Sequence, residues 1–190
     1  IGGGGYTAVK PLVSTAETPG VSGSTISGNT ARQRVGGLFV NNDFVLWTST
    51  IAFNKEQVAG ISGAGLYVKG SRSLYNSIIA KNLSLTTGSD FGAYVLDTVS
   101  GDHNLIMHAN RPVPDDTITA DPLLAALHDN GGVLKTHALL PGSPALNHGN
   151  SSYPVGYWDG RGPGFRRNVG VRDIGSYEFD PDILFASGFN

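Results

Sequence analysis

A short sequence pattern returns every 25 to 28 residues in the first half of this 190-residue chain. The letters STISGN at residues 24–29 are followed by STIAFN at 49–54 and by SIIAKN at 77–82. A second pattern keeps the same spacing, since GGLFV at 36–40 is followed 28 residues later by AGLYV at 64–68. Because separate patterns share one spacing, the sequence predicts a stack of similar structural units.

Each unit combines short apolar strands with polar turns, and such strands bury no apolar face until another unit stacks on them. We therefore predict parallel pairing between successive units, with equivalent residues placed above one another. The expected columns are Ile26, Ile51 and Ile79; Leu38 and Leu66; Leu46 and Leu74; Trp47 and Tyr75. Asn29, Asn54 and Asn82 are expected to stack at one corner, to adopt the left-handed conformation there and to bond to one another as a structural ladder.

The composition is consistent with an all-β chain that has many tight turns. Glycine accounts for 27 of the 190 residues, and only 15% of the residues are charged. Glycine adopts backbone angles that other residues avoid, and a hydrophobic content of 39% is sufficient for one continuous core. These proportions exclude a helical bundle, whose exposed faces need many more charged helix-forming residues.

The units look like the coils of a right-handed parallel β-helix over residues 1 to about 107. The second half contains six motifs in the order seen in bacterial surface proteins called choice-of-anchor Q domain proteins. They are DHNLI at 102–106, DPLL at 121–124, DNGG at 129–132, THALLPGSPA at 136–145, DGRG at 159–162 and DIGSYE at 173–178. The chain thus resembles the C-terminal portion of that family. The resemblance implies an exported β-helix with a C-terminal cap and a sorting or anchoring tail, and it implies no particular chemistry.

An organisation in three parts follows from the repeat and the resemblance. Residues 1–107 are expected to form coils of about 25–28 residues, and residues 108–178 a last coil with a loop-rich cap. Residues 179–190 are expected to form an apolar tail for assembly or sorting. A cap is needed because the ends of such a stack expose strand edges that pair with other chains.

Charge and hydropathy exclude several classes of partner. The formal net charge is −2 and the isoelectric point is near 6.2, so no basic surface for nucleic acid or anionic lipid is expected. No apolar run reaches the length of a membrane span. The absence of cysteine excludes disulfides, thiolate metal sites and a cysteine nucleophile.

The sequence predicts no catalytic, cofactor or metal site. The five histidines have no ligand spacing, and His137 is expected to be a hydrogen-bonded structural residue. Ca²⁺ is the one candidate ion, with acidic residues in loops as ligands, but no EF-type loop is present to hold it. These acidic residues are Asp115, Asp116, Asp121, Asp180 and Asp182. Lys69 and Arg72 come closest to a cationic groove for polysaccharide chemistry, although a solvated turn explains both residues.

The region after residue 150 is rich in aromatic and basic residues. The aromatic residues are Tyr153, Tyr157, Trp158 and Phe165, for which packing within the cap is favoured over a sugar-stacking platform. Arg161, Arg166, Arg167 and Arg172 lie close in sequence to Asp159 and Asp173, which predicts ion pairs inside the cap.

The two ends of the chain suggest self-assembly. Either the sequence is a fragment of a longer stack, or its open N-terminal end docks on a second copy and the contact propagates into a filament. The residues expected to dock by strand addition are Ile183, Leu184, Phe185 and Phe189. We therefore expect an extracellular or bacterial cell-surface structural protein that is most simply non-enzymatic, with other copies of itself and surface glycans as partners. The alternative is a polysaccharide lyase or hydrolase, or a glycan-binding β-helix.

Overall fold

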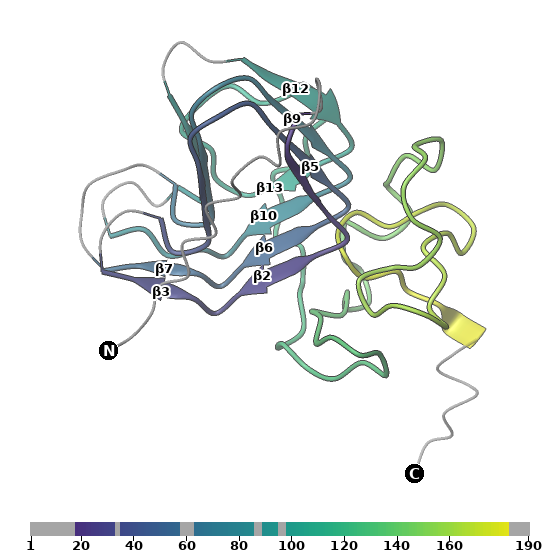
Figure 1. The fold of residues 1–190 in the computed structure, drawn as a ribbon. Helices are drawn as coiled ribbons and strands as arrows, with labels where there is room; N and C mark the ends of the chain where they lie inside the picture. The colour runs from purple at the N-terminus through teal and green to yellow at the C-terminus, as the bar shows by residue number, and fades with distance from the viewer. Residues whose placement is uncertain (1–17, 33–34, 58–62, 86–88, 95–97, 183–190) are drawn as a thin grey trace.

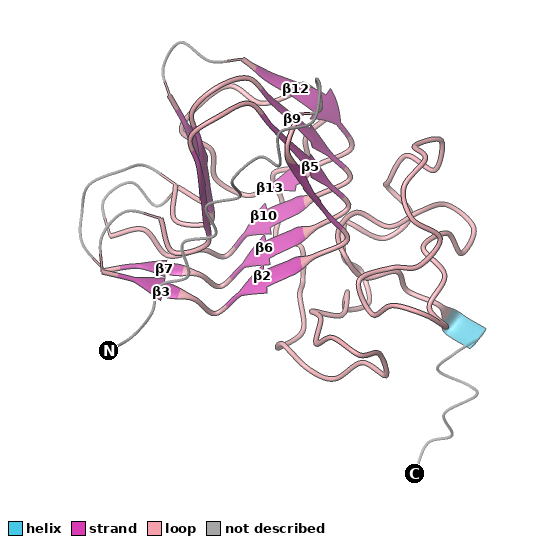
Figure 2. Ribbon diagram, in the orientation of Figure 1, coloured by secondary structure: helices cyan, strands magenta, loops and turns pink. Residues whose placement is uncertain are grey.

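The computed structural model describes residues 18–32, 35–57, 63–85, 89–94 and 98–182. In this part of the chain the named elements are thirteen short strands, and the only helical residues are 181–182 (Figure 2). Every strand pair is parallel. The structure thus confirms the predicted all-β class and its parallel pairing.

Each sheet is formed by strands that are far apart in the sequence (Figure 1). The first sheet has the order β1 (Gly20–Ser22), β5 (Phe44–Trp47), β9 (Arg72–Tyr75), β12 (Val99–Asp102). The second has the order β2 (Thr25–Ser27), β6 (Thr50–Ala52), β10 (Ile78–Ala80), β13 (Leu105–Ile106). The third has the order β4 (Leu38–Val40), β8 (Leu66–Val68), β11 (Phe91–Ala93), and β3 (Thr30–Ala31) pairs with β7 (Lys55–Glu56).

The register between these strands confirms the columns predicted from the repeat. Ile51 of β6 lies between Ile26 and Ile79. The other confirmed pairs are Leu38 with Leu66, Leu46 with Leu74, and Trp47 with Tyr75. A spacing of 25 or 28 residues thus brings the chain back to the equivalent position of the neighbouring strand.

The stack continues through residues 91–106, although the repeated residues are no longer recognisable in that part of the sequence. Strands β11, β12 and β13 pair with β8, β9 and β10 in the same order as the earlier passes. Gly101 occupies the position of Leu46 and Leu74, and a β-carbon on it would lie 1.8 Å from the carbonyl oxygen of Leu74. Asn104 replaces the serines of the earlier corners, and its Oδ1 accepts a hydrogen bond from the backbone N–H of Ser77. The repeat is thus retained in space although its letters change.

The asparagine ladder is present, but the left-handed residues are the ones that precede it. Gly28, Phe53 and Lys81 have φ of 69°, 56° and 57°, whereas Asn54 and Asn82 do not have positive φ. The expectation that the asparagines themselves are left-handed is therefore wrong. The turn is made one residue earlier, which leaves each asparagine side chain free to bond along the stack.

The core lies on both faces of the second sheet. Ile51, Ile79 and Ile106 point into the stack and pack with the apolar residues of the other sheets. Their neighbours Ile78 and Leu105 point to the opposite face, as alternate strand residues do, and pack against residues from the C-terminal half.

Residues from about 121 to 179 lie along this outer face as loops, seen in green and yellow beside β2, β6 and β10 in Figure 1. Hydrogen bonds join the loops to the strands: the backbone N–H of Ser176 donates to Oγ1 of Thr50 at 3.0 Å, and that of Gly175 to the carbonyl oxygen of Asn76 at 2.8 Å. One side of the stack is therefore covered by the protein's own chain.

Candidate functional site

The asparagine ladder ends on a buried carboxylate. Nδ2 of Asn54 donates to Oδ1 of Asn82 at 2.9 Å, and Nδ2 of Asn82 donates to Oδ1 of Asp90 at 3.0 Å. Asp90 is 1% exposed. Its second oxygen, Oδ2, lies 3.1 Å from Nδ1 of His108. Burial raises the pKa of Asp90, while the hydrogen bonds from Asn82 and His108 act in the opposite direction.

This contact orients the ring of His108 through its Nδ1. When Asp90 is ionised its oxygens only accept hydrogen bonds, so Nδ1 of His108 is then the donor in this contact. The side chain of His108 is 61% exposed, and Asp90 behind it is buried. A buried carboxylate behind an exposed imidazole fixes the orientation and the tautomer of the ring.

His108 lines a hollow of about 560 Å³ next to Ile106 of β13. Asn110 and Arg111 also line it, and each has a buried polar atom with no partner in the described part of the chain, Oδ1 of Asn110 and Nε of Arg111. Nη1 of Arg111 donates to the carbonyl oxygen of Asn110 at 3.0 Å. Among the described residues that line this hollow, none is acidic. We call this feature the His108 hollow.

A second polar cluster consists of Asp102, His103 and Asp116. Nδ1 of His103 lies 2.8 Å from Oδ1 of Asp102 and 3.4 Å from Oδ2 of Asp116. Within the described ranges no other group of three such residues lies close enough to share a metal ion. The three side chains are 30–43% exposed and already bond to one another. Tyr153 donates a hydrogen bond to the other oxygen of Asp102, and this contact raises the pKa of Tyr153 to about 12.

Of the acidic residues considered for Ca²⁺, only Asp116 belongs to this cluster. Asp121 instead accepts a hydrogen bond from Nζ of Lys81 at 2.6 Å. Oδ1 of Asp180 accepts the backbone N–H of Asp182 at 2.9 Å, which is a local turn contact. The described residues therefore do not bring the predicted acidic loops together around one ion.

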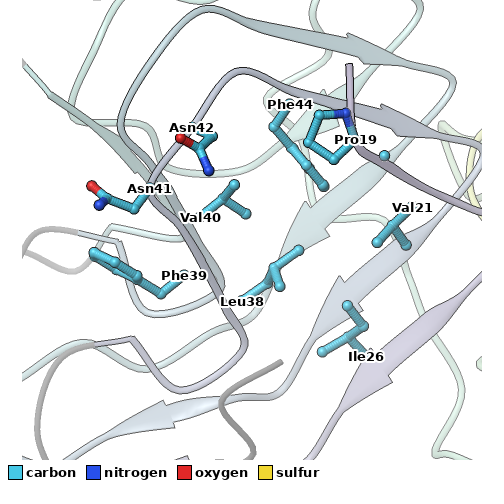
Figure 3. A pocket seen from close by; sticks show the side chains of 10 residues that line it. Pro19, Val21, Ile26, Leu38, Phe39, Val40, Asn41, Asn42 and Phe44 are labelled. Atoms are coloured by element: carbon cyan, nitrogen blue, oxygen red, sulfur yellow. The ribbon is translucent and has the colours of Figure 1, made fainter. Parts of the chain in front are cut away.

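An apolar hollow of about 270 Å³ lies at the other end of the stack, among the first strands of three sheets. Figure 3 shows Val21, Ile26, Leu38, Val40 and Phe44 around this space. Val21, Ile26 and Val40 are only partly buried, although they occupy the inward positions of their strands. This end of the core is incompletely covered by the described residues.

Several ionisable residues of the C-terminal loops are buried, and two of them form an ion pair. Arg161 forms an ion pair with Asp159 at 2.7 Å, and its guanidinium lies 4.1 Å from the ring centroids of both Phe165 and Tyr177. Glu178 is 2% exposed, and burial raises its pKa to about 8. The predicted ion pairing inside this region is thus confirmed for Arg161 and Asp159.

The aromatic residues divide into a packed set and an exposed pair. The rings of Trp47 and Tyr75 stack with centroids 4.1 Å apart, and Tyr153 packs against both at 5.1 and 4.9 Å. Tyr157 and Trp158 are 67% and 38% exposed and meet edge to face. Packing, as predicted, explains Tyr153, and the exposed pair lies apart from it on the loops.

His137, which the sequence analysis singled out, has a clear structural role. Nδ1 of His137 donates to the carbonyl oxygen of Ala125 at 2.7 Å, and Nε2 lies 2.7 Å from Oγ of Ser27. Because a carbonyl only accepts, Nε2 is the acceptor in the Ser27 contact. The two contacts confirm the predicted role of His137 as a hydrogen-bonded structural residue. Burial lowers the pKa of its ring.

Arg72 corrects the sequence analysis. It is 1% exposed, and it donates to the carbonyl oxygens of Thr98 at 2.8 Å and Val68 at 3.0 Å. The interpretation of Arg72 as a solvated turn residue is therefore wrong, and the guanidinium does not line a cationic groove with Lys69. Ile183, Leu184, Phe185 and Phe189, the predicted assembly residues, lie outside the described residues.

The His108 hollow was not predicted from the sequence. Asp90 and His108 are 18 residues apart and belong to no motif, so only the position of Asp90 after the last asparagine of the ladder gives a signal. Comparisons with models of protein families, with curated proteins and with solved structures found no match to this chain. No helix in the described part of the chain has the length and hydropathy needed to cross a membrane.

Proposed function

We propose that the chain is a right-handed parallel β-helix with a structural role outside a bacterial cell. Four passes of the chain with parallel, in-register strands support a helical path. Right-handedness is supported by the general rule that connections between parallel strands of one sheet are nearly always right-handed. The extracellular location rests on the six motifs that resemble choice-of-anchor Q domain proteins.

The observation that carries the structural role is the way the repeated polar residues are used. The asparagines of successive passes bond to each other and to backbone carbonyls along the stack. The serine corners do the same, since the backbone N–H of Ser24 donates to Oγ of Ser49 and that of Ser49 to Oγ of Ser77. The buried side chains of Asn54 and Asn82 make their hydrogen bonds inside the stack, so they stabilise the stacking and are not available for chemistry on a substrate.

We also propose that copies of the chain associate through the apolar hollow at the first-strand end. Partly buried apolar side chains support this role, and so do β1, β2 and β4, which have no further strand partner among the described residues, because an uncovered strand edge pairs with another chain. The proposal extends to a head-to-tail filament that uses Ile183, Leu184, Phe185 and Phe189.

Light scattering over a range of concentrations, together with electron microscopy of the same samples, tests this association. Val40→Lys places a charge in the hollow and should abolish concentration-dependent growth in mass. Val171→Lys, at a residue that is 52% exposed on the C-terminal loops, is the matched control and should leave growth unchanged. A protein that remains monomeric at every concentration, or equal effects of the two variants, would contradict the proposal.

The alternative of a polysaccharide lyase or hydrolase is weakened by the structure. Its two candidate bases were Lys69 and Arg72, and Arg72 is bonded to backbone carbonyls inside the protein. A glycan-binding role would draw on the exposed pair Tyr157 and Trp158, whose rings meet with centroids 4.6 Å apart. Binding of neutral glycans on an array, lost in Trp158→Ala, is the measurement that would favour it.

A further inference from the structure

We infer that Ser27 and His137 act as a nucleophile and its general base in the hydrolysis of small carboxylic esters. Ser27 is the last residue of β2, and His137 belongs to the C-terminal loops that cover the second sheet. The inference goes beyond the structural role proposed above and does not depend on it. It rests on the hydrogen bonds of these two side chains and on the position of Ser27 at the edge of its sheet.

The hydrogen bonds of His137 show which atom donates in each contact. A backbone carbonyl only accepts, so Nδ1 of His137 carries a hydrogen and donates it to Ala125 at 2.7 Å. In the neutral ring Nε2 is then the acceptor, and it lies 2.7 Å from Oγ of Ser27, whose hydroxyl donates to it. Burial lowers the pKa of His137 and so favours the neutral ring. A hydroxyl that donates to an imidazole held by a third group is the arrangement that activates a serine nucleophile.

The repeat does not require a hydroxyl group at the position of Ser27. Its register partners in the next two strands are Ala52 and Ala80, and both are fully buried. Ser27 is only partly buried, and no described strand lies beyond β2 in its sheet. The next residue, Gly28, is exposed, and a β-carbon built on it would meet no heavy atom within 4 Å. A small reagent can therefore approach Ser27 from this edge.

The backbone of Ser27 provides a donor for the negative charge that develops in the reaction. The N–H of Thr50 in β6 donates to the carbonyl oxygen of Ser24, so Ser24 directs its backbone groups toward β6. Because successive residues of a strand direct these groups to opposite sides, Ile26 also faces β6 and Ser27 faces the open edge. The N–H of Ser27 has no partner there among the described residues. It can donate to the oxygen of a tetrahedral intermediate formed on the neighbouring Oγ.

These groups and one water molecule balance the reaction. Oγ of Ser27 attacks the carbonyl carbon of the ester, and its proton passes to Nε2 of His137. The bond between this carbon and the oxygen of the leaving alcohol then breaks, and the imidazolium returns the proton to that oxygen. Water, deprotonated by Nε2, hydrolyses the acyl-serine and restores the hydroxyl of Ser27. The ring of Phe53, 39% exposed and 4.9 Å from that of His137, offers an apolar surface to the ester.

A fluorophosphonate probe tests the nucleophile, and p-nitrophenyl acetate tests turnover. We expect one probe molecule per chain, located on Ser27 by mass spectrometry, and hydrolysis of the acetate above the rate in buffer. Ser27→Ala should remove both signals. Thr25→Ala is the matched control, because Thr25 lies on the same strand and bonds Oγ of Ser176 on the loops at 2.8 Å instead of an imidazole. It should keep both signals.

Two further measurements test the base. His137→Gln should slow labelling by the probe on the order of a hundredfold. Because this change also removes a contact that holds the loops, Ser27→Cys provides a second measurement in a chain that has no cysteine of its own. An imidazole partner favours the thiolate, so at pH 7 Ser27→Cys should react with iodoacetamide on the order of tenfold faster than Thr25→Cys.

Three results would overturn the inference. The first is a probe that does not label Ser27. The second is a loss of labelling in Thr25→Ala that equals the loss in Ser27→Ala. The third is an equal rate of reaction of Ser27→Cys and Thr25→Cys with iodoacetamide.

Discussion

Truncation of Asn54 should destabilise the protein far more than the same change at Asn29, one pass away in the ladder. The Asn54 side chain is fully buried. Its Nδ2 donates to the carbonyl oxygens of Ile26 and Ala52 at 2.9 and 3.1 Å and to Oδ1 of Asn82 at 2.9 Å. Its Oδ1 accepts from the backbone N–H and from Nδ2 of Asn29 at 3.1 and 2.9 Å.

These contacts allow the magnitude to be worked out. The amide has two hydrogens, so its three donor contacts count as two full hydrogen bonds, and the two accepted bonds bring the total to four. At about 1 kcal/mol of net free energy for each bond, Asn54→Ala should lower the free energy of unfolding by about 4 kcal/mol. Asn29 lies at the exposed end of the ladder, where water replaces its one side-chain bond to Asn54. Asn29→Ala should therefore cost less than about 1 kcal/mol.

Urea unfolding, monitored by the fluorescence of Trp47 and Trp158, measures both changes under the same conditions. Asn54→Asp is an informative third variant, because it keeps the acceptor oxygen and replaces the donor by a second acceptor that faces Oδ1 of Asn82. It should be at least as destabilising as the alanine variant near neutral pH. The reasoning fails if Asn54→Ala and Asn29→Ala lower the free energy of unfolding by equal amounts.

Three further variants test the backbone and the buried charges. Gly101→Ala should lower the free energy of unfolding in urea by at least about 3 kcal/mol. The reason is that φ is +112° and the new β-carbon would lie 1.8 Å from the carbonyl oxygen of Leu74. A decrease below about 1 kcal/mol would contradict this packing. Thr48 has φ of 40° and a buried hydroxyl without a partner in the described residues. Thr48→Gly should therefore raise the free energy of unfolding by up to about 1 kcal/mol, since relief of strain exceeds the entropy cost of glycine, and a loss would refute it. The pKa of Glu178 is raised from 4.5 to about 8 by burial, so its contribution to stability is complete below pH 4.5 and falls as the pH rises to about 8. Glu178→Gln should flatten this part of the stability profile measured by denaturation at a series of pH values, and an unchanged slope would show that Glu178 does not cause it.

The residues that were predicted correctly are those whose neighbours are set by the repeat. Ile26, Ile51 and Ile79 could be aligned because each lies at the same place in its own unit, and stacking brings equal places together. The sequence did not predict the register at positions of the repeat where a residue of another type stands. Gly101 and Asn104 belong to the same columns as leucine and serine residues, and their letters alone do not show it.

The sequence by itself determined the all-β class, the parallel pairing and the registers of the first strands in each sheet. The reason is that residues 25 or 28 positions apart are of the same type, and stacking brings them together. Only the tertiary structure decided which residues outside the repeat come into contact with the residues of the stack. Ser176 bonds to Thr50 across 126 residues, and His108 reaches Asp90 at the end of the ladder. The burial of Arg72 and the His108 hollow were decided in the same way. Such contacts depend on how loops of unlike sequence pack against a finished stack, and no periodic pattern encodes that packing.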